Sequence, residues 1–497
     1  MNLLTDKWVP VQERGRFKQA SLEEVLCHNS DLSLSLPRND LEMAALQLLV
    51  SLTQVIWMPK DVSELRLRIK SPLSPEEYQS GIKERKHWFD LEHPEYPFMQ
   101  DRTTPQTAFA SIQGIFAGMP DEKSTSSHAL FVEASQISYA CPSCTTLAVF
   151  NRASCTPNYS GKHKGSLRGG APVTTLLLGN NLRENIWLNV MSSEFVKKIM
   201  PLDENANNLP VWVNPIKNNS SFGVQTIGLL RGLFWQPIHI LFHNWEHGVC
   251  QLCGTEGKVH GDYLRASDFK YKLNGVWPHP HSPRVWDIKK GERDRDRFLS
   301  FTTTAPTWTR LNEMLLEKQD KKKGMQSAGV IRQYEKHLTD IPFFLAVGGY
   351  RNKQASILER RHEGFSFKQG WQNDKNRLTK FIERGLEIKT LLRKKSYGFG
   401  KSVGVEGVAN ETETKFFTAT EMLVLSTLRE MNWRDSKAEL LSFTEKASKA
   451  AVKVFDETTR PYSQDVRMIS HLVRARNSLS RELKKLITSN KENADGD

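Results

Sequence analysis

A chain of 497 residues is too long for one ordinary hydrophobic core, so we expect roughly two or three domains. Its 69 lysines and arginines outnumber 56 aspartates and glutamates, and the net charge of +13 favours anionic partners such as nucleic acids. No run of about 18 apolar residues occurs and the N-terminus lacks the features of a signal peptide, so we expect no membrane span and a cytoplasmic location.

The first part of the chain, residues 1–372, alternates short strand-like runs, turns and a few helices. A buried helix is expected over residues 39–57, where Asn39 or Asp40 would cap apolar residues at helical spacing. Runs rich in β-branched or aromatic residues predict three strands: HALFVEAS (128–135), PVTTLLLG (172–179) and FLSFTTTAP (298–306). We therefore predict an α+β fold class, with a large, irregular, mixed α/β N-terminal domain.

Four of the six cysteines form two C-x-x-C pairs, Cys141 with Cys144 and Cys250 with Cys253. Two such pairs complete a tetrahedral shell with no open position, which is typical of a structural zinc site. A thioredoxin-like redox role is the alternative for a single C-x-x-C pair, but two copies favour zinc. The remaining cysteines have no partner by spacing and are expected to be small buried residues.

Two glycine-containing segments carry cations. Residues 157–170, PNYSGKHKGSLRGG, combine four glycines with Lys162, Lys164 and Arg168. A backbone without Cβ atoms can approach a groove or a phosphate closely, although an ordinary surface loop is the alternative. The second segment, GGYRNKQASILERRHEG (348–364), adds an amide side chain, Gln354, after two glycines that would act as a hinge.

The surroundings of Gln354 are strongly basic. Residues 347–403 contain 14 Lys and Arg against 5 Asp and Glu. Charge runs of this kind commonly form solvated helical faces, but this density is typical of phosphate binding.

The segment HNWEH supplies an enzymatic alternative, a zinc hydrolase using His243, Glu246 and His247. The preceding QPIHILFH alternates like a strand, so no helical turn would bring the two imidazoles together. The prolines of WPHPHSP likewise favour a rigid loop over a metal site at His279 and His281. YGFGKS (397–402) lacks the first glycine of a phosphate-binding loop, so no ATPase is expected.

The last part of the chain, residues 373–497, changes to long helical periods. Helices are expected over residues 373–395, 418–433, 435–459 and 463–487. Apolar residues step by three or four along the last two of these, at Leu440, Phe443, Ala447, Ala451 and Val454, and at Leu479, Leu483 and Leu486. This spacing predicts an all-α four-helix bundle as the C-terminal domain.

Long blocks spread over nearly the whole chain resemble the CasA family, the large subunit of the type I-E CRISPR surveillance complex, Cascade. They include MNLLTDKWVPV, LSLPRNDLEMAALQLLVSLTQ, YPFMQ, LRGGAPVTTLLLG, RGLFWQPIHI, NGVWPHPHSP, FTTTAPTW and GGYRNKQASILERRHEG. The resemblance implies a non-enzymatic subunit in antiviral defence. Such a subunit recognises the protospacer-adjacent motif (PAM) in double-stranded DNA, starts strand separation and R-loop formation, and leaves sequence matching to the guide RNA.

The resemblance also implies partners. They are target double-stranded DNA, the CRISPR guide RNA handle, a helicase-nuclease, and the other Cascade subunits, namely the small-subunit dimer and the backbone and handle-binding subunits. A scaffold that binds only protein and guide RNA stays an alternative, as does a nuclease.

Individual positions receive roles from the same resemblance. The PAM-reading minor-groove loop falls on Asn158, Tyr159, Ser160 and Gly161. Asn158 and Ser160 stand where the best-known pattern has glycine, which implies a different motif preference. The wedge that enters under the first base pair falls on Gln354, flanked by Lys353 and Ala355.

Further implied contacts are spread along the chain. Phe131 would contact the guide RNA handle and the complex backbone, and the four paired cysteines match a zinc site of relatives. A minor-groove lysine is expected in YLRASDFKYK, where Asp268 stands at the counted position and Arg265 or Lys270 are the candidate substitutes. Lys289 and Lys290 match basic residues that guide the displaced strand.

Overall fold

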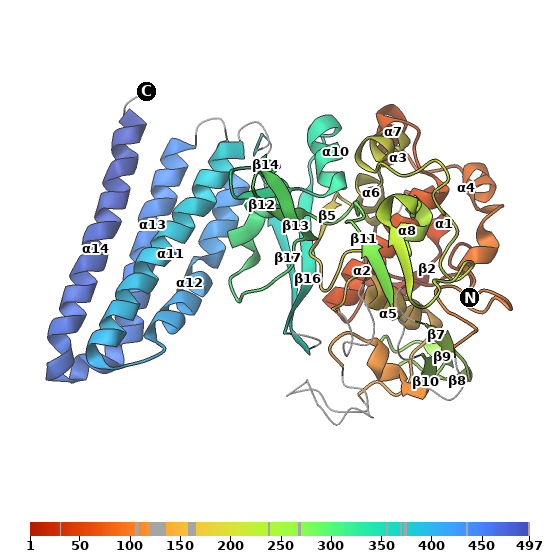
Figure 1. The fold of residues 1–497 in the computed structure, drawn as a ribbon, viewed down its shortest axis with the longest axis horizontal. Coiled ribbons are helices and arrows are strands. Elements are labelled where there is room, and N and C mark those ends of the chain that lie inside the picture. The colour runs from red at the N-terminus through yellow and green to blue at the C-terminus, as the bar shows by residue number, and fades with distance from the viewer. Residues whose placement is uncertain are drawn as a thin grey trace. The chain divides into compact units, whose positions relative to one another are not determined.

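The computed structural model describes residues 1–29, 31–104, 109–119, 136–157, 166–236, 239–266, 270–353, 356–367, 370–371, 375–433 and 436–495 (Figure 1). The chain forms two compact units. The first unit comprises Met1–Thr302, Glu317–Leu338 and Leu345–Gly364, and the second comprises Thr303–Leu316, Thr339–Phe344 and Phe365–Asp497. The second unit thus takes in two short segments that precede the predicted domain boundary in the sequence.

The first unit is built from short helices around one long one. Its α-helices are α1 (Leu22–Cys27), α2 (Asn39–Ile56), α3 (Val62–Lys70), α4 (Pro75–Ile82), α5 (Pro142–Ser154), α6 (Leu182–Leu188), α7 (Ser193–Ile199), α8 (Leu229–Leu233) and α10 (Gly329–His337). Short 3-10 helices span Lys86–Phe89, Ile112–Ile115 and Val224–Thr226.

Helix α2 confirms the predicted buried helix. It is buried along nearly its whole length and packs against α5, α6 and α8, because apolar residues occur on all sides rather than on one stripe. Its N-cap is Arg38, which makes no side-chain capping bond, so the expected cap at Asn39 or Asp40 is wrong. Asp40 instead lies in the first turn, where its carboxylate pairs with the Arg38 guanidinium.

Several small sheets are distributed over the first unit, with β16 starting in the second. They are β2-β1-β3 (Arg16–Ala20, Val9–Glu13, Leu32–Leu34), β4-β10-β7 (Phe109–Ser111, Asp262–Arg265, Ile240–Phe242), β11-β6 (Tyr271–Asn274, Ser220–Gly223), β13-β12-β15-β14 (Glu292–Phe298, Arg284–Lys289, Lys323–Gln326, Lys318–Gln319), β17-β16-β5 (Ser356–Ser366, Phe344–Lys353, Thr174–Leu178) and β8-β9 (Glu246–Val249, Glu256–Val259). With the helices, these sheets confirm the predicted α+β class.

The three predicted strands have different outcomes. Strand β5 lies inside PVTTLLLG and confirms that prediction. The run FLSFTTTAP is not a strand, because β13 ends at Phe298 and only Ser300 and Phe301 form isolated bridges before Thr302–Thr304 become exposed. The third run, HALFVEAS, lies outside the described residues.

The expected glycine hinge at Gly348 and Gly349 is wrong, because both residues lie inside a strand of the β16–β17 hairpin. Gly348 and Gly349 lie in the interior of β16 and are buried. A Cβ atom on Gly348 would lie 2.7 Å from Cδ2 of His362 and 2.9 Å from Cε of Met43. Glycine is needed there because neighbouring side chains approach the strand closely, so it provides room for packing rather than a flexible joint.

Four long helices form the second unit's bundle, drawn in blue in Figure 1: α11 (Lys375–Val403), α12 (Val408–Glu430), α13 (Lys437–Thr459) and α14 (Val466–Asp495). Helix α9 (Leu311–Leu315) and 3-10 turns at Thr307–Arg310 and Arg460–Gln464 also belong to the described part of the unit. Each long helix packs against its neighbours in the bundle, as predicted. YGFGKS lies inside α11 and is therefore not a phosphate-binding loop.

The apolar periods of the bundle behave as predicted. Phe443, Ala447, Ala451 and Val454 of α13 are buried, and so are Leu479 and Leu483 of α14. Helix α12 starts earlier than expected, directly after Gly407, whose φ of 85° ends the preceding turn. Among the helices described, none combines the length and the apolar character needed to cross a bilayer.

Candidate nucleic-acid interface and metal centre

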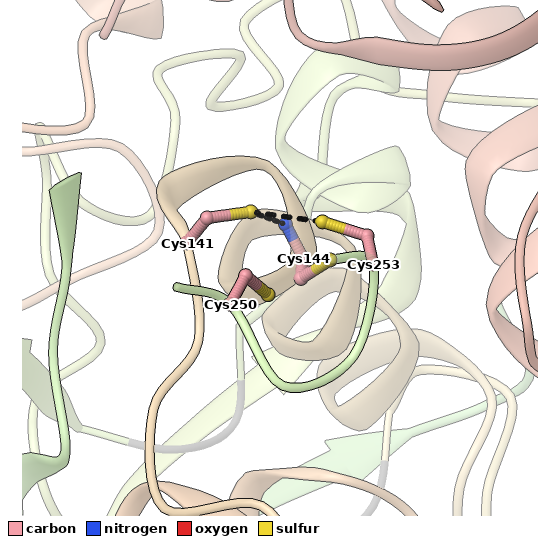
Figure 2. A group of neighbouring side chains, drawn as sticks. All are labelled: Cys141, Cys144, Cys250 and Cys253. Carbon is pink, nitrogen blue, oxygen red and sulfur yellow. Dashed lines mark hydrogen bonds between the residues drawn. The ribbon is translucent and has the colours of Figure 1, made fainter. Parts of the chain in front are cut away.

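The two C-x-x-C pairs meet in space, as Figure 2 shows. The Sγ atoms of Cys141, Cys144, Cys250 and Cys253 all lie within 4.8 Å of one another. Cys141 Sγ and Cys253 Sγ are 3.7 Å apart, although the two residues are separated by 112 positions. The cluster therefore joins two distant segments of the first unit.

Local structure prepares each pair for this arrangement. Cys141 is the N-cap of α5, and its sulfur accepts a hydrogen bond from the backbone N–H of Cys144 at 3.5 Å. The other pair lies in a turn closed by Cys250, whose N–H donates to Thr255 O and whose carbonyl accepts from Gly254. Gly254 has a φ of 73°, a left-handed conformation that glycine adopts without strain, so the chain can reverse sharply here.

The cluster fits a four-coordinate soft metal ion. Four sulfurs placed at the usual Zn–S length in a tetrahedron lie about 3.8 Å from one another, close to the separation of Cys141 and Cys253. Hydrogen bonds from Cys141 and Cys144 lower the pKa of Cys250 and lower that of Cys253 to about 6, whereas hydrogen bonds among the four thiols and burial raise the pKa of Cys141 and Cys144. A metal ion would favour the thiolate form of all four, because the thiolate is the form that binds. Four protein ligands leave no open position, which is the arrangement of a structural site.

The HNWEH segment does not form a second metal site. Glu246 and His247 lie in β8, consistent with an extended chain rather than a helix. Nε2 of His243 lies 3.6 Å from the Asp262 carboxylate. Among the described residues, the four cysteines are the only group of three or more potential ligands close enough to share an ion.

His279 and His281 are buried members of the core. Gln47 donates its amide to Nδ1 of His281 at 3.3 Å, and Nε2 of His281 lies 3.2 Å from the Asn189 carbonyl. Nδ1 of His279 accepts from the backbone N–H of His281 at 3.1 Å. Burial lowers the pKa of His281 to about 3, so its imidazole is neutral and serves as a hydrogen-bonded brace.

Lys289 and Lys290 lie at the turn between β12 and β13. Lys289 is exposed and pairs with the Asp294 carboxylate at 2.7 Å. Lys290 is exposed in a left-handed conformation with a φ of 51°. A second basic turn lies directly beside this one, because the N–H of Ile288 donates to the carbonyl of Lys322 at 2.7 Å.

The second turn is a candidate element that the sequence analysis missed. Asp320 Oδ1 accepts from the backbone N–H groups of Lys322 and Lys323 at 2.7 and 2.9 Å, which closes the turn between β14 and β15. Lys321, Lys322 and Lys323 are exposed. The run DKKKG was visible in the sequence, but its position next to Lys289 and Lys290 depends on the pairing of β12 with β15.

The two candidates for a minor-groove cation lie on either side of an undescribed segment. Arg265 is the last residue of β10, where it pairs with Ile240 of β7. Lys270 is exposed and lies just before β11, where its backbone N–H donates to Asn218 Oδ1 and its carbonyl accepts from the N–H of Asn219. Asp268 lies outside the described residues, as does Phe131.

The PAM-loop residues Asn158–Gly161 and the wedge residues Gln354 and Ala355 also lie outside the described residues. Lys353 is described as the exposed last residue of β16. The residues that flank these segments are buried together in one cluster of Ala117, Cys155, Ala171 and Tyr350, with Ile357 packed against it. In sequence, Ala117 precedes the segment of Phe131, Cys155 and Ala171 bracket the segment of Asn158–Gly161, and Tyr350 and Ile357 bracket Gln354.

The expectation that Arg168 belongs to a cationic surface is wrong. Its side chain is buried, with Nη1 donating to the hydroxyls of Thr174 and Ser282 at 2.8 Å each. Nη2 donates to the Ser154 carbonyl at 2.7 Å and approaches Cys155 Sγ at 3.4 Å. Arg168 therefore connects the chain on the two sides of residues 158–165 instead of facing a phosphate. The buried position of Cys155 is as predicted, whereas Cys27 is only half-buried.

The arginines around Gln354 are also engaged within the protein. Arg351 and Arg361 both pair with the Glu359 carboxylate at 2.8 Å. Arg360 pairs with Asp40 at 3.3 Å. Each of these guanidinium groups therefore has a carboxylate partner within the first unit, and a role at DNA phosphates stays a prediction.

Comparisons with known proteins give a consistent result. The family model described as CRISPR-associated protein Cse1 matches residues 2–455. The structure resembles CasA of Thermus thermophilus, with 16% sequence identity, a TM-score of 0.75, and coverage of 98% of this chain and 99% of that one. Cse1 of Thermobifida fusca gives 18% identity, a TM-score of 0.75, and 98% coverage of both chains.

A chain of a CRISPR RNA-guided surveillance complex is also similar, with 15% identity, a TM-score of 0.67, and coverage of 96% of this chain and 99% of that one. These structural likenesses establish a shared fold over almost the full length. Because the family model spans most of the sequence, the chain belongs to the CRISPR-associated Cse1 family.

Proposed function

We propose that this protein is the large subunit of a type I-E Cascade complex and that it recognises the PAM in double-stranded DNA. Family membership and the likeness to a chain of a CRISPR RNA-guided surveillance complex support the assignment to such an assembly. In it, the protein contacts the guide RNA handle and the other subunits, and it helps recruit a separate helicase-nuclease. We assign it no catalytic step and a cytoplasmic location.

One observation carries the proposal furthest. Residues that precede or follow, in the sequence, the segments expected to hold the PAM loop, the wedge and the guide-RNA contact are buried in one cluster. A common base of this kind suits a device that must read a motif and open the adjacent base pair in one place. The loop of Asn158–Gly161 reads the minor groove, whose donor and acceptor pattern is degenerate, so several related motifs are accepted.

Strand opening follows from the wedge. Gln354 inserts under the first base pair beyond the motif, at a cost of a few kcal/mol for unstacking one step. Contacts to the inserted amide and to the backbone offset this cost, and Lys353, the exposed last residue of β16, directly precedes Gln354 in the sequence. Arg265 or Lys270 supplies the minor-groove cation, and Lys289 with Lys290 attracts the displaced strand's phosphates.

The four cysteines hold a structural Zn²⁺ ion in this proposal. The metal joins α5 to the turn at Cys250, so it stabilises the helix that precedes residues 158–165 in the sequence. It takes no part in DNA chemistry, because all four coordination positions belong to protein sulfurs.

The test uses the assembled complex with and without this chain. In gel shifts at stated salt, motif-bearing duplex should bind more tightly than motif-free duplex only when the chain is present. Gln354→Ala should leave this binding nearly intact and reduce permanganate reactivity at the first base pair beyond the motif. Gly161→Asp should weaken motif binding itself, because bulk and negative charge would enter the groove.

Two results would contradict the proposal. Equal discrimination without the chain would show that another subunit reads the motif. Unchanged opening in Gln354→Ala would remove the wedge role and leave a scaffold that binds protein and guide RNA.

A further inference from the structure

Tyr350 has a buried hydroxyl at the base of the hairpin that leads to Gln354. The residue lies in β16, and its side chain is 1% exposed. Its oxygen lies 3.0 Å from Oδ2 of Asp40 and 2.7 Å from Nδ2 of Asn151. A hydroxyl has one hydrogen, so it donates to the carboxylate and accepts from the amide.

The two partners belong to other elements. Asn151 lies near the end of α5, which stops at Ser154 just before the segment of the proposed PAM loop. Asp40 lies in the first turn of α2, the buried long helix. The Tyr350 hydroxyl therefore connects the wedge hairpin, the helix leading into the PAM loop and the central support of the first unit.

Charge makes this junction strong. Arg38 binds Asp40 with two hydrogen bonds of 3.0 and 2.8 Å and also donates to the Ala117 carbonyl at 2.7 Å. Burial raises the pKa of Asp40, but the hydrogen bonds and charge of Arg38, together with Arg360, hold that pKa below its usual value. The carboxylate is ionised, and hydrogen bonds to charged groups are stronger than neutral ones.

The neighbourhood adds a second connection between the same elements. Tyr350 packs in the buried cluster with Ala117, Cys155 and Ala171, and Ile357 of β17 covers it. The cluster thus contains residues on both sides of the PAM-loop segment and on both sides of Gln354. A shift of β16 relative to α5 would break the hydrogen bond to Asn151 and disturb this packing together.

We propose that Tyr350 is a positioning residue that couples PAM reading to strand opening, by holding the wedge hairpin in register with α5. The inference rests on the proposed function of Gln354 and of residues 158–161. It assigns to Tyr350 no contact with DNA, since the hydroxyl is enclosed by Asp40 and Asn151.

The test removes the hydroxyl and keeps the ring. In Tyr350→Phe the aromatic packing stays, and Asp40 keeps Arg38 and Arg360 as partners, while Asn151 loses its acceptor. In the assembled complex, opening of motif-bearing duplex, followed by 2-aminopurine fluorescence at the first base pair, should slow about tenfold, the effect of losing one hydrogen bond to a charged group. Affinity for the motif duplex should change less than opening does.

Tyr78→Phe is the matched control. The Tyr78 ring is fully buried in the first unit, and its hydroxyl donates to the Leu4 carbonyl at 2.7 Å, with neither residue in the buried cluster of Tyr350. Tyr78→Phe should lower the melting temperature about as much as Tyr350→Phe does. It should leave the opening of motif-bearing DNA unchanged. Asn151→Ala removes the other side of the junction and should reproduce the opening defect of Tyr350→Phe.

A double-mutant cycle separates positioning from simple destabilisation. If Tyr350 acts through the wedge, Tyr350→Phe combined with Gln354→Ala should open DNA no more slowly than Gln354→Ala alone. Additive losses would overturn the inference, because they would show that Tyr350 affects opening by another route. Normal opening in Tyr350→Phe beside impaired opening in Gln354→Ala would overturn it while leaving the proposed function intact. Normal opening in Gln354→Ala would overturn both.

Discussion

Arg168 shows how much the role of a single residue depends on burial. Its guanidinium is enclosed in the first unit, and none of the described residues places a carboxylate against it. Burial lowers its pKa, and only hydroxyls, a carbonyl, a thiol and the Gln47 amide oxygen compensate the lost water. Such a site depends on the forked geometry of arginine, because several acceptors must be reached at once.

Replacing Arg168 by lysine should therefore destabilise the protein although the charge is kept. A single ammonium cannot reach Ser154 and Ser282 together, and we expect a loss of about 2–4 kcal/mol, as for other disrupted buried networks. Calorimetry of the purified chain measures it. Arg295→Lys, at an exposed position, should leave the melting temperature unchanged. A stable Arg168→Lys variant would contradict the bracing role.

The cysteines were predictable from sequence and Arg168 was not. Spacing alone identifies pairs of thiols that can share an ion, because a C-x-x-C turn is local chemistry. Arg168 stands among glycines and lysines, where composition indicates a surface loop, and only the fold shows that its side chain turns inward. Lys321–Lys323 are a third case, since their significance comes from a neighbouring strand.

Removing the metal should lower the stability of the protein without changing which DNA motif it prefers. We expect chelator dialysis, or Cys250→Ser, to reduce the melting temperature by about 5 °C or more, because the bound ion contributes to folding. Cys27→Ser is the control, since Cys27 lies outside the cluster. Metal content by mass spectrometry accompanies the melts. Equal melting with and without chelator would show that the thiols do not bind a structural ion.

Elements were predicted with uneven success. The helices of the second unit follow from their apolar periods, because each helix buries one stripe against its neighbours. The run FLSFTTTAP fails as a strand because β-branched residues favour strands only where the chain pairs continuously with a neighbouring strand, and beyond Phe298 the described pairing is limited to isolated bridges at Ser300 and Phe301. Gly348 and Gly349 suggest a turn by composition, whereas close contacts keep them inside β16.

The paired turns of the β12–β13 and β14–β15 hairpins support a prediction at this scale. The double variant Lys321→Glu, Lys322→Glu should expose the displaced strand to nuclease. It should also make the slope of log binding constant against log salt concentration shallower by about 0.7 for each phosphate that is no longer neutralised. The control, Lys453→Glu, reverses an exposed charge on α13. Nuclease footprints over a salt series provide the measurement. Footprints that match those of the unmodified complex would show that the displaced strand contacts Lys289 and Lys290 but not the Lys321–Lys323 turn.

On the scale of the whole molecule, several histidines of the first unit are buried or half-buried and neutral. Burial lowers the pKa of His260 and His362 to about 4, and that of His281 to about 3. In the unfolded chain these imidazoles take up protons near pH 6.5. The unfolded state therefore binds more protons than the folded state below that pH, so stability falls as pH decreases from 6.5 toward 4.

His281→Gln should reduce this pH dependence. An amide can accept from Gln47 and donate to Asn189 as the imidazole does, but it does not titrate. The free energy of unfolding, from thermal melts, falls between pH 7.5 and pH 5. This fall should be about 2 kcal/mol smaller in the variant than in the unmodified chain. Equal pH dependence in the two proteins would show that His281 is already protonated in the folded state.

The separation of the two cysteine pairs has a consequence for synthesis. Cys141 and Cys253 lie 112 positions apart, so the first pair leaves the ribosome on the order of 10 seconds before the second, at usual elongation rates. During that interval the nascent chain holds two thiols without their partners. A polypeptide released before Cys250 would carry half of the sulfur cluster, so the turn at Cys250–Cys253 marks the point in translation after which the first unit can close around an ion.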